Sequence, residues 1–126
     1  MSSARVPLHR PAHGVQSLSA VHGLGATLEL LLSIGPEVIE QRALQLSREL
    51  AEGLENQGFT VVSSMRERER SGILSAQRDG IDVPTIQKTL VAERVACASR
   101  EGRVRVSPQF YNTPEEVAKC LACLPK

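Results

Sequence analysis

Aromatic residues are scarce in this sequence of 126 residues, which has two Phe, one Tyr and no Trp. Leu, Val, Ile and Ala must therefore build the core, and platforms for stacking nucleic-acid bases are not expected. An excess of charge is lacking as well, because 15 basic residues accompany 14 acidic ones. A nearly neutral chain has no electrostatic reason to bind nucleic acid or an anionic membrane. These features predict one soluble globular domain.

Cysteine is also scarce, and Cys97, Cys120 and Cys123 are odd in number. The N-terminus lacks the charged and then apolar layout of a signal peptide. Reduced thiols and a cytoplasmic location are therefore the simplest interpretation. The apolar stretch over residues 18–34 contains a His and a Glu and is too short to span a bilayer, so no membrane partner is expected.

Helical periodicity dominates the first half of the chain. Residues 1–16 contain Pro, His and Ser without a period, which predicts an arm or linker before a single domain over residues 17–126. A helix is expected from Ser17 to Ser33, and Pro36 is well placed to begin the next one. Gly58 stands where a left-handed cap should end that second helix. Its apolar stripe comprises Ile39, Ala43, Leu46, Leu50 and Leu54.

Short strands and two capped helices are predicted for the second half. Asp82 should cap a helix that runs to Glu93, and Thr113-Pro114-Glu115-Glu116 is a capping box that opens the last helix. Val117, Ala118, Leu121 and Leu124 should continue that helix, and Pro125 should end it. Strands are expected at residues 59–63, 72–77, 95–100 and 103–108, the last two joined by a hairpin turn. The fold class is α+β: a small, largely antiparallel sheet with helices packed on one face, preceded by a long helix.

The last strand alternates apolar and basic residues. Val104 and Val106 share one face, whereas Arg103, Arg105 and Ser107 share the other. If the valines face the helices, the arginines face outward. A planar guanidinium there could hold a carboxylate through two parallel hydrogen bonds. The other interpretation is that both arginines are solvated strand residues.

Residues 103–116 resemble the C-terminal segment of class V aminotransferases, the fold-type I pyridoxal-phosphate enzymes that include cysteine desulfurases, selenocysteine lyases and isopenicillin-N-epimerase-like proteins. Further landmarks of that family are similar to residues 23–31, 71–73 and 99–102, so the resemblance covers nearly the whole chain. It implies that Arg105 binds the α-carboxylate of an amino-acid substrate. It also implies that the chain is the family's small domain, and that the large cofactor-binding domain is missing.

The resemblance assigns pyridoxal phosphate to that large domain, with its Schiff-base lysine, a pyridine-binding aspartate and a ring-stacking residue. Lys88, Lys119 and Lys126 lack the context of the family's lysine. The expectation is that the chain alone has no catalytic residue and binds no cofactor. Its partner would be a large pyridoxal-phosphate domain or a second copy in a homodimer.

Three positions depart from the family pattern. Gln109 stands where the selenocysteine-lyase branch often has His. Val15 occupies the place of a Thr whose hydroxyl reaches the cofactor phosphate of a neighbouring subunit. Arg94 stands where a helix-capping Gly is common, and a left-handed arginine there would cost roughly 1–2 kcal/mol.

The remaining cysteines and histidines predict no metal site. Cys97 is expected on a regular strand as a structural thiol, and the pair Cys120 and Cys123 closes a helix, away from the dipole end that activates thiols. His9 and His13 cannot share a helical face across Pro11. Two hypotheses follow: a truncated or stand-alone small domain of a class V enzyme, or a non-catalytic assembly module. The module would dock its arm and bare sheet face on a large domain or on itself.

Overall fold

The structure of the chain is a computed structural model that describes residues 17–125. The predicted arm, residues 1–16, lies outside the described residues, as does Lys126. The chain divides into two compact units between Ser33 and Ile34. The expected domain limits stay a prediction.

The first unit contributes helix α1 (Leu18–Ile34), close to the predicted range of residues 17–33. None of its residues is buried. No single helix among residues 17–125 is long and apolar enough to cross a membrane. Only α1 and α2 (Pro36–Asn56), taken as a broken pair, satisfy the length and composition that such a span requires.

Helix α2 begins at Pro36, as predicted, and buries Leu46, Leu50 and Leu54 along one stripe. Ile39 and Ala43 are only half-buried. Gly58 ends the helix with φ 80°. Its N–H donates to the Glu55 carbonyl at 2.9 Å and that of Phe59 to the Leu54 carbonyl at 3.0 Å, which closes the helix as a Schellman motif.

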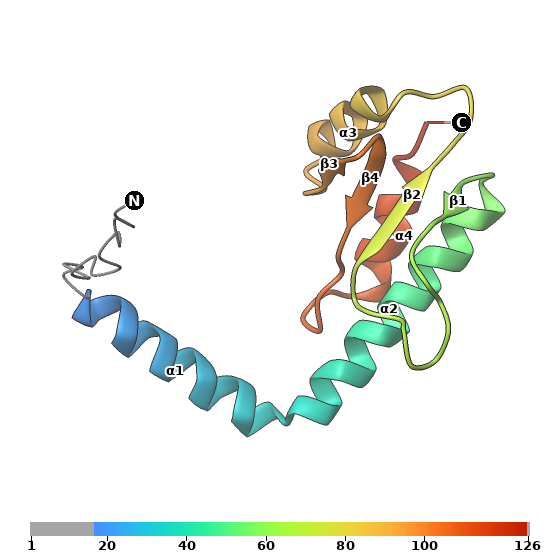
Figure 1. Cartoon of the computed structure of the whole chain (residues 1–126). Helices are drawn as coiled ribbons and strands as arrows, with labels where there is room; N and C mark the ends of the chain where they lie inside the picture. The colour runs from blue at the N-terminus through green and yellow to red at the C-terminus, as the bar shows by residue number, and fades with distance from the viewer. Residues whose placement is uncertain (1–16, 126) are drawn as a thin grey trace, which may run out of the picture. The chain divides into compact units, whose positions relative to one another are not determined.

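Four antiparallel strands form the described sheet in the order β1-β2-β4-β3 (Figure 1). Their bounds are β1 (Thr60–Val61), β2 (Leu74–Gln77), β3 (Ala98–Arg100) and β4 (Arg103–Val106). Each is shorter than the sequence pattern predicted. The turn between β3 and β4 has positive φ at both Glu101 and Gly102.

Helices α3 (Val83–Ala92) and α4 (Pro114–Ala122) begin at the predicted caps. The Asp82 side chain accepts the N–H of Thr85, and Thr113 and Glu116 form the capping box. The predicted end of the last helix was wrong, because α4 stops at Ala122 and Leu124 lies beyond it. Ala118 is exposed, whereas Cys120 and Leu124 are buried.

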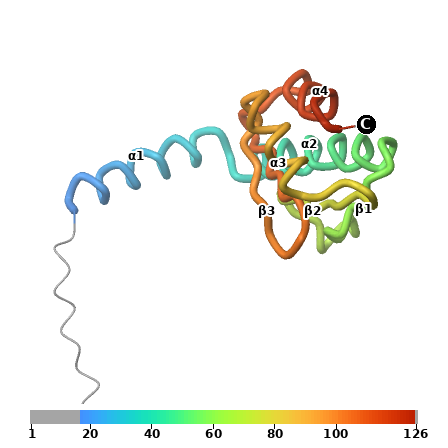
Figure 2. The backbone as a smooth tube through the Cα atoms, turned by 90° about the horizontal axis from the view of Figure 1, so that it is seen from above, coloured from blue at the N-terminus to red at the C-terminus, as the bar shows by residue number. Residues whose placement is uncertain are grey.

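The core lies between the sheet and these helices, and α2 and α4 run side by side on one side of the strands (Figure 2). It contains Leu46, Leu50 and Leu54 from α2, Leu74 and Ala76 from β2, Ile86 and Leu90 from α3, Val104 from β4, and Val117 and Cys120 from α4. The predicted α+β class, with an antiparallel sheet and helices on one face, is confirmed.

Candidate functional site

Strand β4 carries Arg105 on the face of the sheet opposite the helices. Val104 is fully buried, and Val106 packs against the core from the same side. Because successive strand residues point to opposite faces, Arg103 and Arg105 point away from the core. Both are half-buried. The predicted orientation of the strand is therefore confirmed.

Small side chains flank Arg105 on both neighbouring strands. β4 is an inner strand, and Arg105 pairs with Ser75 of β2 and with Ala98 of β3. Directly opposite residues on one face lie close enough for their side chains to touch. Serine and alanine are too short to cover a guanidinium, so space remains beside Arg105 for a ligand.

The hairpin places two further arginines near the same face. Arg103 pairs directly with Arg100 across the turn, an arrangement of like charges that is unfavourable unless an anion lies near. The Nε of Arg103 is shielded from solvent and has no hydrogen-bond partner. Within residues 17–125 the one ion pair is Arg66–Glu69, so all three hairpin arginines are without an acidic partner.

A hydrogen-bonded turn holds β4 against α4. The N–H of Gln109 donates to Asn112 Oδ1 at 2.8 Å, and Asn112 Nδ2 donates to Glu116 Oε2 at 3.0 Å. The same Glu116 oxygen accepts the N–H of Thr113 at 2.9 Å. These hydrogen bonds, that from Asn112 foremost, hold the pKa of Glu116 below its usual value. Arg42 of α2 donates to the Asn112 carbonyl at 3.3 Å and ties the turn to the core.

Sequence reasoning missed Asn112 and Arg42. The signal for Asn112 was its place just before the capping box, where an amide can reach the third helical residue. Arg42 gave no signal, because its partner lies 70 residues away. Gln109 stands where the resembling family branch often has a histidine. It contributes only its backbone N–H to this network.

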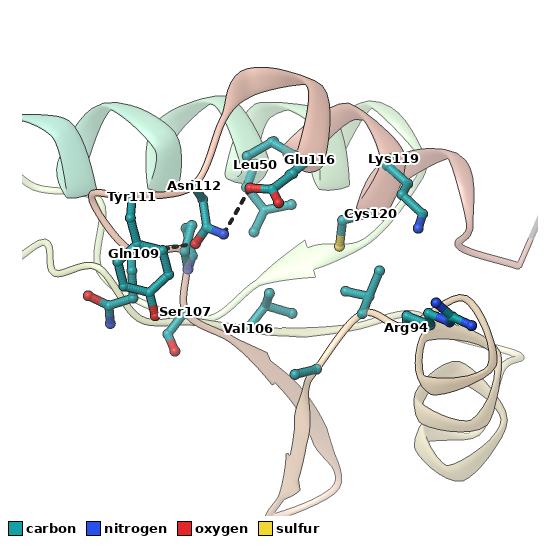
Figure 3. Close-up of a pocket in the computed structure, with 14 residues that line it drawn as sticks. Leu50, Arg94, Val106, Ser107, Gln109, Tyr111, Asn112, Glu116, Lys119 and Cys120 are labelled. Atoms are coloured by element: carbon teal, nitrogen blue, oxygen red, sulfur yellow. Dashed lines mark hydrogen bonds between the residues drawn. The ribbon is translucent and has the colours of Figure 1, made fainter.

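A cavity of about 340 Å³ opens beside this turn on the helix side of the sheet (Figure 3). Leu50, Val106, Val117 and Cys120 form its apolar floor. Figure 3 places Arg94 and Lys119 on the side away from Tyr111. Arg105 does not line this cavity.

The described residues do not form a pyridoxal-phosphate site. Lys88 and Lys119 are both exposed on helices, and only Lys119 lines the cavity. Glu116 is the only carboxylate there and is already engaged by Asn112 and Thr113. A group held by Lys119 would lie on the helix side of β4, whereas Arg105 faces the other way. The two could not act on one substrate.

The three cysteines are free thiols with differing burial. The prediction of a regular strand over residues 95–99 was wrong, because β3 starts only at Ala98 and leaves Cys97 in the connection from α3. Burial raises the pKa of Cys97 and raises that of Cys120 to about 11, where Cys123 and Cys97 add to the effect. Such thiols stay protonated near neutral pH and are poor nucleophiles.

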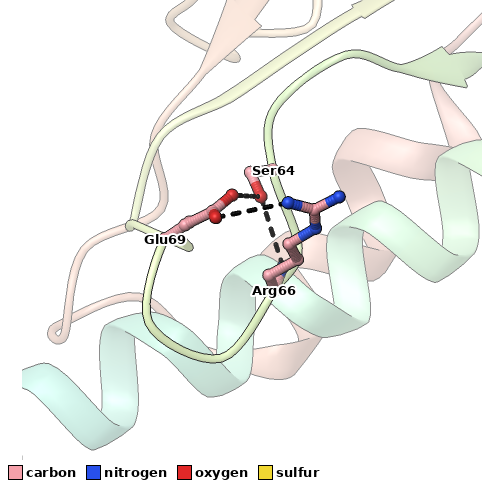
Figure 4. Close-up of polar contacts among 3 residues, drawn as sticks. All are labelled: Ser64, Arg66 and Glu69. Atoms are coloured by element: carbon pink, nitrogen blue, oxygen red, sulfur yellow. Dashed lines mark hydrogen bonds and ion pairs between the residues drawn. The ribbon is translucent and has the colours of Figure 1, made fainter.

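Local polar contacts join three residues of the loop between β1 and β2 (Figure 4). The Ser64 hydroxyl donates to Glu69 Oε2 at 2.6 Å, and Arg66 pairs with the other Glu69 oxygen at 3.4 Å. These contacts are local and exposed, so the loop offers no site. Residues 17–125 contain no group of His, Cys, Asp or Glu that could hold a metal ion, and His9 and His13 lie outside that range.

Comparisons with known proteins place these features in a family. The aminotransferase class-V family model matches residues 5–120. The apo cysteine desulfurase of Thermococcus onnurineus NA1 is 23% identical with a TM-score of 0.75, over 79% of this chain and 28% of that one. A NifS-like protein gives the same identity and score over 86% of this chain and 33% of its own. The chain thus spans about a third or less of these structures, and it matches no curated protein.

Proposed function

This chain belongs to the aminotransferase class-V family, and we propose that Arg105 binds the α-carboxylate of an amino-acid substrate in a pyridoxal-phosphate-dependent enzyme. The observation that carries the proposal is a half-buried arginine on an inner strand, flanked by Ser75 and Ala98. It has no acidic partner among residues 17–125. Holding a guanidinium in such a place is costly unless an anion offsets the lost hydration.

The chemistry of the arginine suits a carboxylate. Its planar guanidinium offers two parallel N–H donors that match the two oxygens of a carboxylate, and it stays charged at any physiological pH. β4 holds the Cα of Arg105 through pairing on both sides, so only the side chain must be ordered on binding. Arg105 therefore binds and orients the substrate without moving a proton.

The cofactor would be supplied by a polypeptide segment other than residues 1–126. Bound there, pyridoxal phosphate provides the electron sink for reactions at the α-carbon or β-substituent of an amino acid. The contribution of this chain is the open face of the sheet, with Arg105 at its centre. The family match and the share of each solved structure that is covered support this division of labour.

A titration of the complete chain tests the proposal directly. The Arg Nε–Hε signals of the ¹⁵N-labelled protein are followed as L-alanine is added, and Arg105→Lys assigns the signal of interest. That signal should shift with a dissociation constant weaker than about 1 mM, because one partly exposed arginine has no dry pocket to work in. L-alaninamide, which lacks the carboxylate, is the matched control and should shift nothing. Equal shifts at Arg100, Arg103 and Arg105 would indicate only a general basic surface.

A kinetic test applies once a lysine-bearing domain is combined with this chain. Arg105→Ala should lower kcat/KM by roughly 100-fold, since loss of a charge-assisted bidentate contact costs on the order of 2–3 kcal/mol. Arg105→Lys should recover part of this loss, because an ammonium cannot reproduce the planar fork. Arg103→Ala is the matched control and should do much less. Unchanged kinetics for Arg105→Ala would refute the proposal.

A further inference from the structure

The hairpin of β3 and β4 gathers three arginines on the open face of the sheet. Arg103 and Arg105 stand two residues apart on β4, so both point to that face. The Cα atoms of alternate strand residues lie roughly 7 Å apart. Arg100 of β3 lies directly opposite Arg103. The open face therefore has a second cationic position, formed by Arg100 and Arg103, next to Arg105.

No acidic residue neutralises this second position. Among residues 17–125 the one ion pair lies in the loop between β1 and β2, so Glu101 of the hairpin turn pairs with neither arginine. On β2, Ser75 pairs with Arg105, and the same register continues to Gln77 beside Arg103. Both of these neighbours are uncharged. Like charges opposite one another destabilise a sheet, so an anion between Arg100 and Arg103 would relieve their repulsion.

Two half-buried arginines elsewhere in the chain show how such a group is satisfied within the protein. Arg42 donates to the Asn112 carbonyl at 3.3 Å, and Arg78 donates to the Pro125 carbonyl at 2.8 Å. Arg103, in contrast, has its Nε shielded from solvent without a hydrogen-bond partner. A shielded donor on a charged group is costly to leave unpaired. A carboxylate is the acceptor that suits a guanidinium best.

The two cationic positions fit the two ends of one small molecule. We propose that the amino-acid substrate carries a second anionic group on its side chain, and that Arg103 and Arg100 bind this group. The inference rests on the proposed role of Arg105, which holds the α-carboxylate of the same molecule. Because the first contact holds the second group close by, the second contact adds affinity at little further entropic cost. Arg103 then determines specificity for acidic over neutral amino acids.

A paired titration of the complete ¹⁵N-labelled chain tests this specificity. L-glutamate and L-glutamine share the α-carboxylate and nearly the same size, and differ in the charge of the side chain. L-glutamate should shift the Nε–Hε signals of both Arg103 and Arg105 and should bind roughly 10-fold more tightly than L-glutamine. L-glutamine should shift only the signal of Arg105. Equal dissociation constants, with Arg105 shifted by both ligands, would overturn the inference and leave the proposed function intact. No shift of Arg105 with either ligand would refute the proposed function, and this inference with it.

Substitution of Arg103 identifies the residue responsible. Arg103→Gln should lower the affinity for L-glutamate to that for L-glutamine and leave L-glutamine binding unchanged. Arg48→Gln removes the same charge from an exposed position on α2, on the other side of the sheet, and should change neither. Equal losses in the two variants would show that only the net charge matters and would overturn the inference. If Arg103→Gln does not fold, the comparison of the two ligands on the native chain still decides.

A free anion offers the same chemistry as an acidic side chain, and inorganic phosphate separates the two sources. Phosphate should bind Arg103 more weakly than L-glutamate does, because it lacks the contact with Arg105. Phosphate that shifts Arg103 at lower concentration than L-glutamate does would show an independent anion site and overturn the inference.

Discussion

Arg94 and Gly58 occupy equivalent capping positions after α3 and α2, but the backbone conformation there strains only the arginine. After α3, the N–H of Arg94 donates to the Val91 carbonyl and that of Val95 to the Leu90 carbonyl, the same pattern that ends α2 at Gly58. Both capping residues have positive φ, 62° for Arg94 and 80° for Gly58. Glycine takes this conformation freely, whereas an L-residue with a Cβ is strained there. The predicted left-handed conformation of Arg94 is confirmed.

Replacing Arg94 with glycine should therefore stabilise the protein. Relief of the strain, about 1–2 kcal/mol, exceeds the extra unfolded-state entropy of glycine and leaves a gain of roughly 0.5–1 kcal/mol. Urea denaturation of the complete chain measures this difference. Arg94→Ala is the control, since it removes the guanidinium but keeps the Cβ, and it should give no gain. Equal stabilisation by both variants would mean that the charge, and not the backbone, is responsible.

At the scale of elements, the close approach of α2 and α4 depends on Gly53. A Cβ added at Gly53 would overlap the methyl groups of Leu121, so the Leu121 side chain would have to shift to admit any other residue. Gln57 reinforces this contact, because its side chain donates to the Leu121 carbonyl at 3.0 Å. An interior glycine, which weakens a helix taken alone, permits in α2 the packing that holds α4 on the core.

Gly53→Ala should destabilise the protein by about 1 kcal/mol, because overpacking of 1–3 kcal/mol outweighs the higher helix propensity of alanine. In a Leu121→Ala background the overlap is absent, so the same change should become neutral or stabilising by up to about 1 kcal/mol. Chemical denaturation of the four proteins in this cycle measures the coupling. Additive effects of the two substitutions on the free energy of unfolding would show that contact with Leu121 is not the reason for a glycine at position 53.

At the scale of the whole molecule, the described residues supply the proposed carboxylate-binding arginine but no site for the cofactor. Arg105 lies on the open face of the sheet, whereas the cavity with Lys119 lies on the helix side. The solved structures that share this fold are much longer, since 79% of this chain covers 28% of one and 86% of it covers 33% of the other. The chemistry proposed for Arg105 therefore needs a cofactor from outside these residues.

Pyridoxal phosphate added to the complete chain should consequently give no saturable visible absorption band. Exposed amines such as Lys88 and Lys119 should react only weakly and without preference, because neither has a partner that orients the cofactor. Lys88→Arg and Lys119→Arg serve as controls, and each should leave the weak absorbance nearly unchanged. A saturable band that one of these substitutions removes would contradict the prediction.

Local chemistry in the sequence determined much of this protein. Pro36 was predicted as the first residue of α2, and Asp82 and Thr113 as the N-caps of α3 and α4. All three predictions are confirmed, because the start of a helix depends on residues within one turn. The alternation in β4 predicted the outward face of Arg105 for a similar reason, because successive residues of a strand point to opposite faces of the sheet. The resemblance of residues 103–116 pointed to the family whose model matches the chain.

Only the tertiary structure decided features that depend on distant residues. The strands are shorter than their patterns because pairing partners limit them, and Cys97 consequently lies before β3. Cys120 is buried and Ala118 exposed because the rotation of α4 is set by its contact with α2. The bond from Arg42 to the Asn112 carbonyl joins residues 70 apart. No local pattern encodes such contacts, since their energies arise only when the packed core brings both partners together.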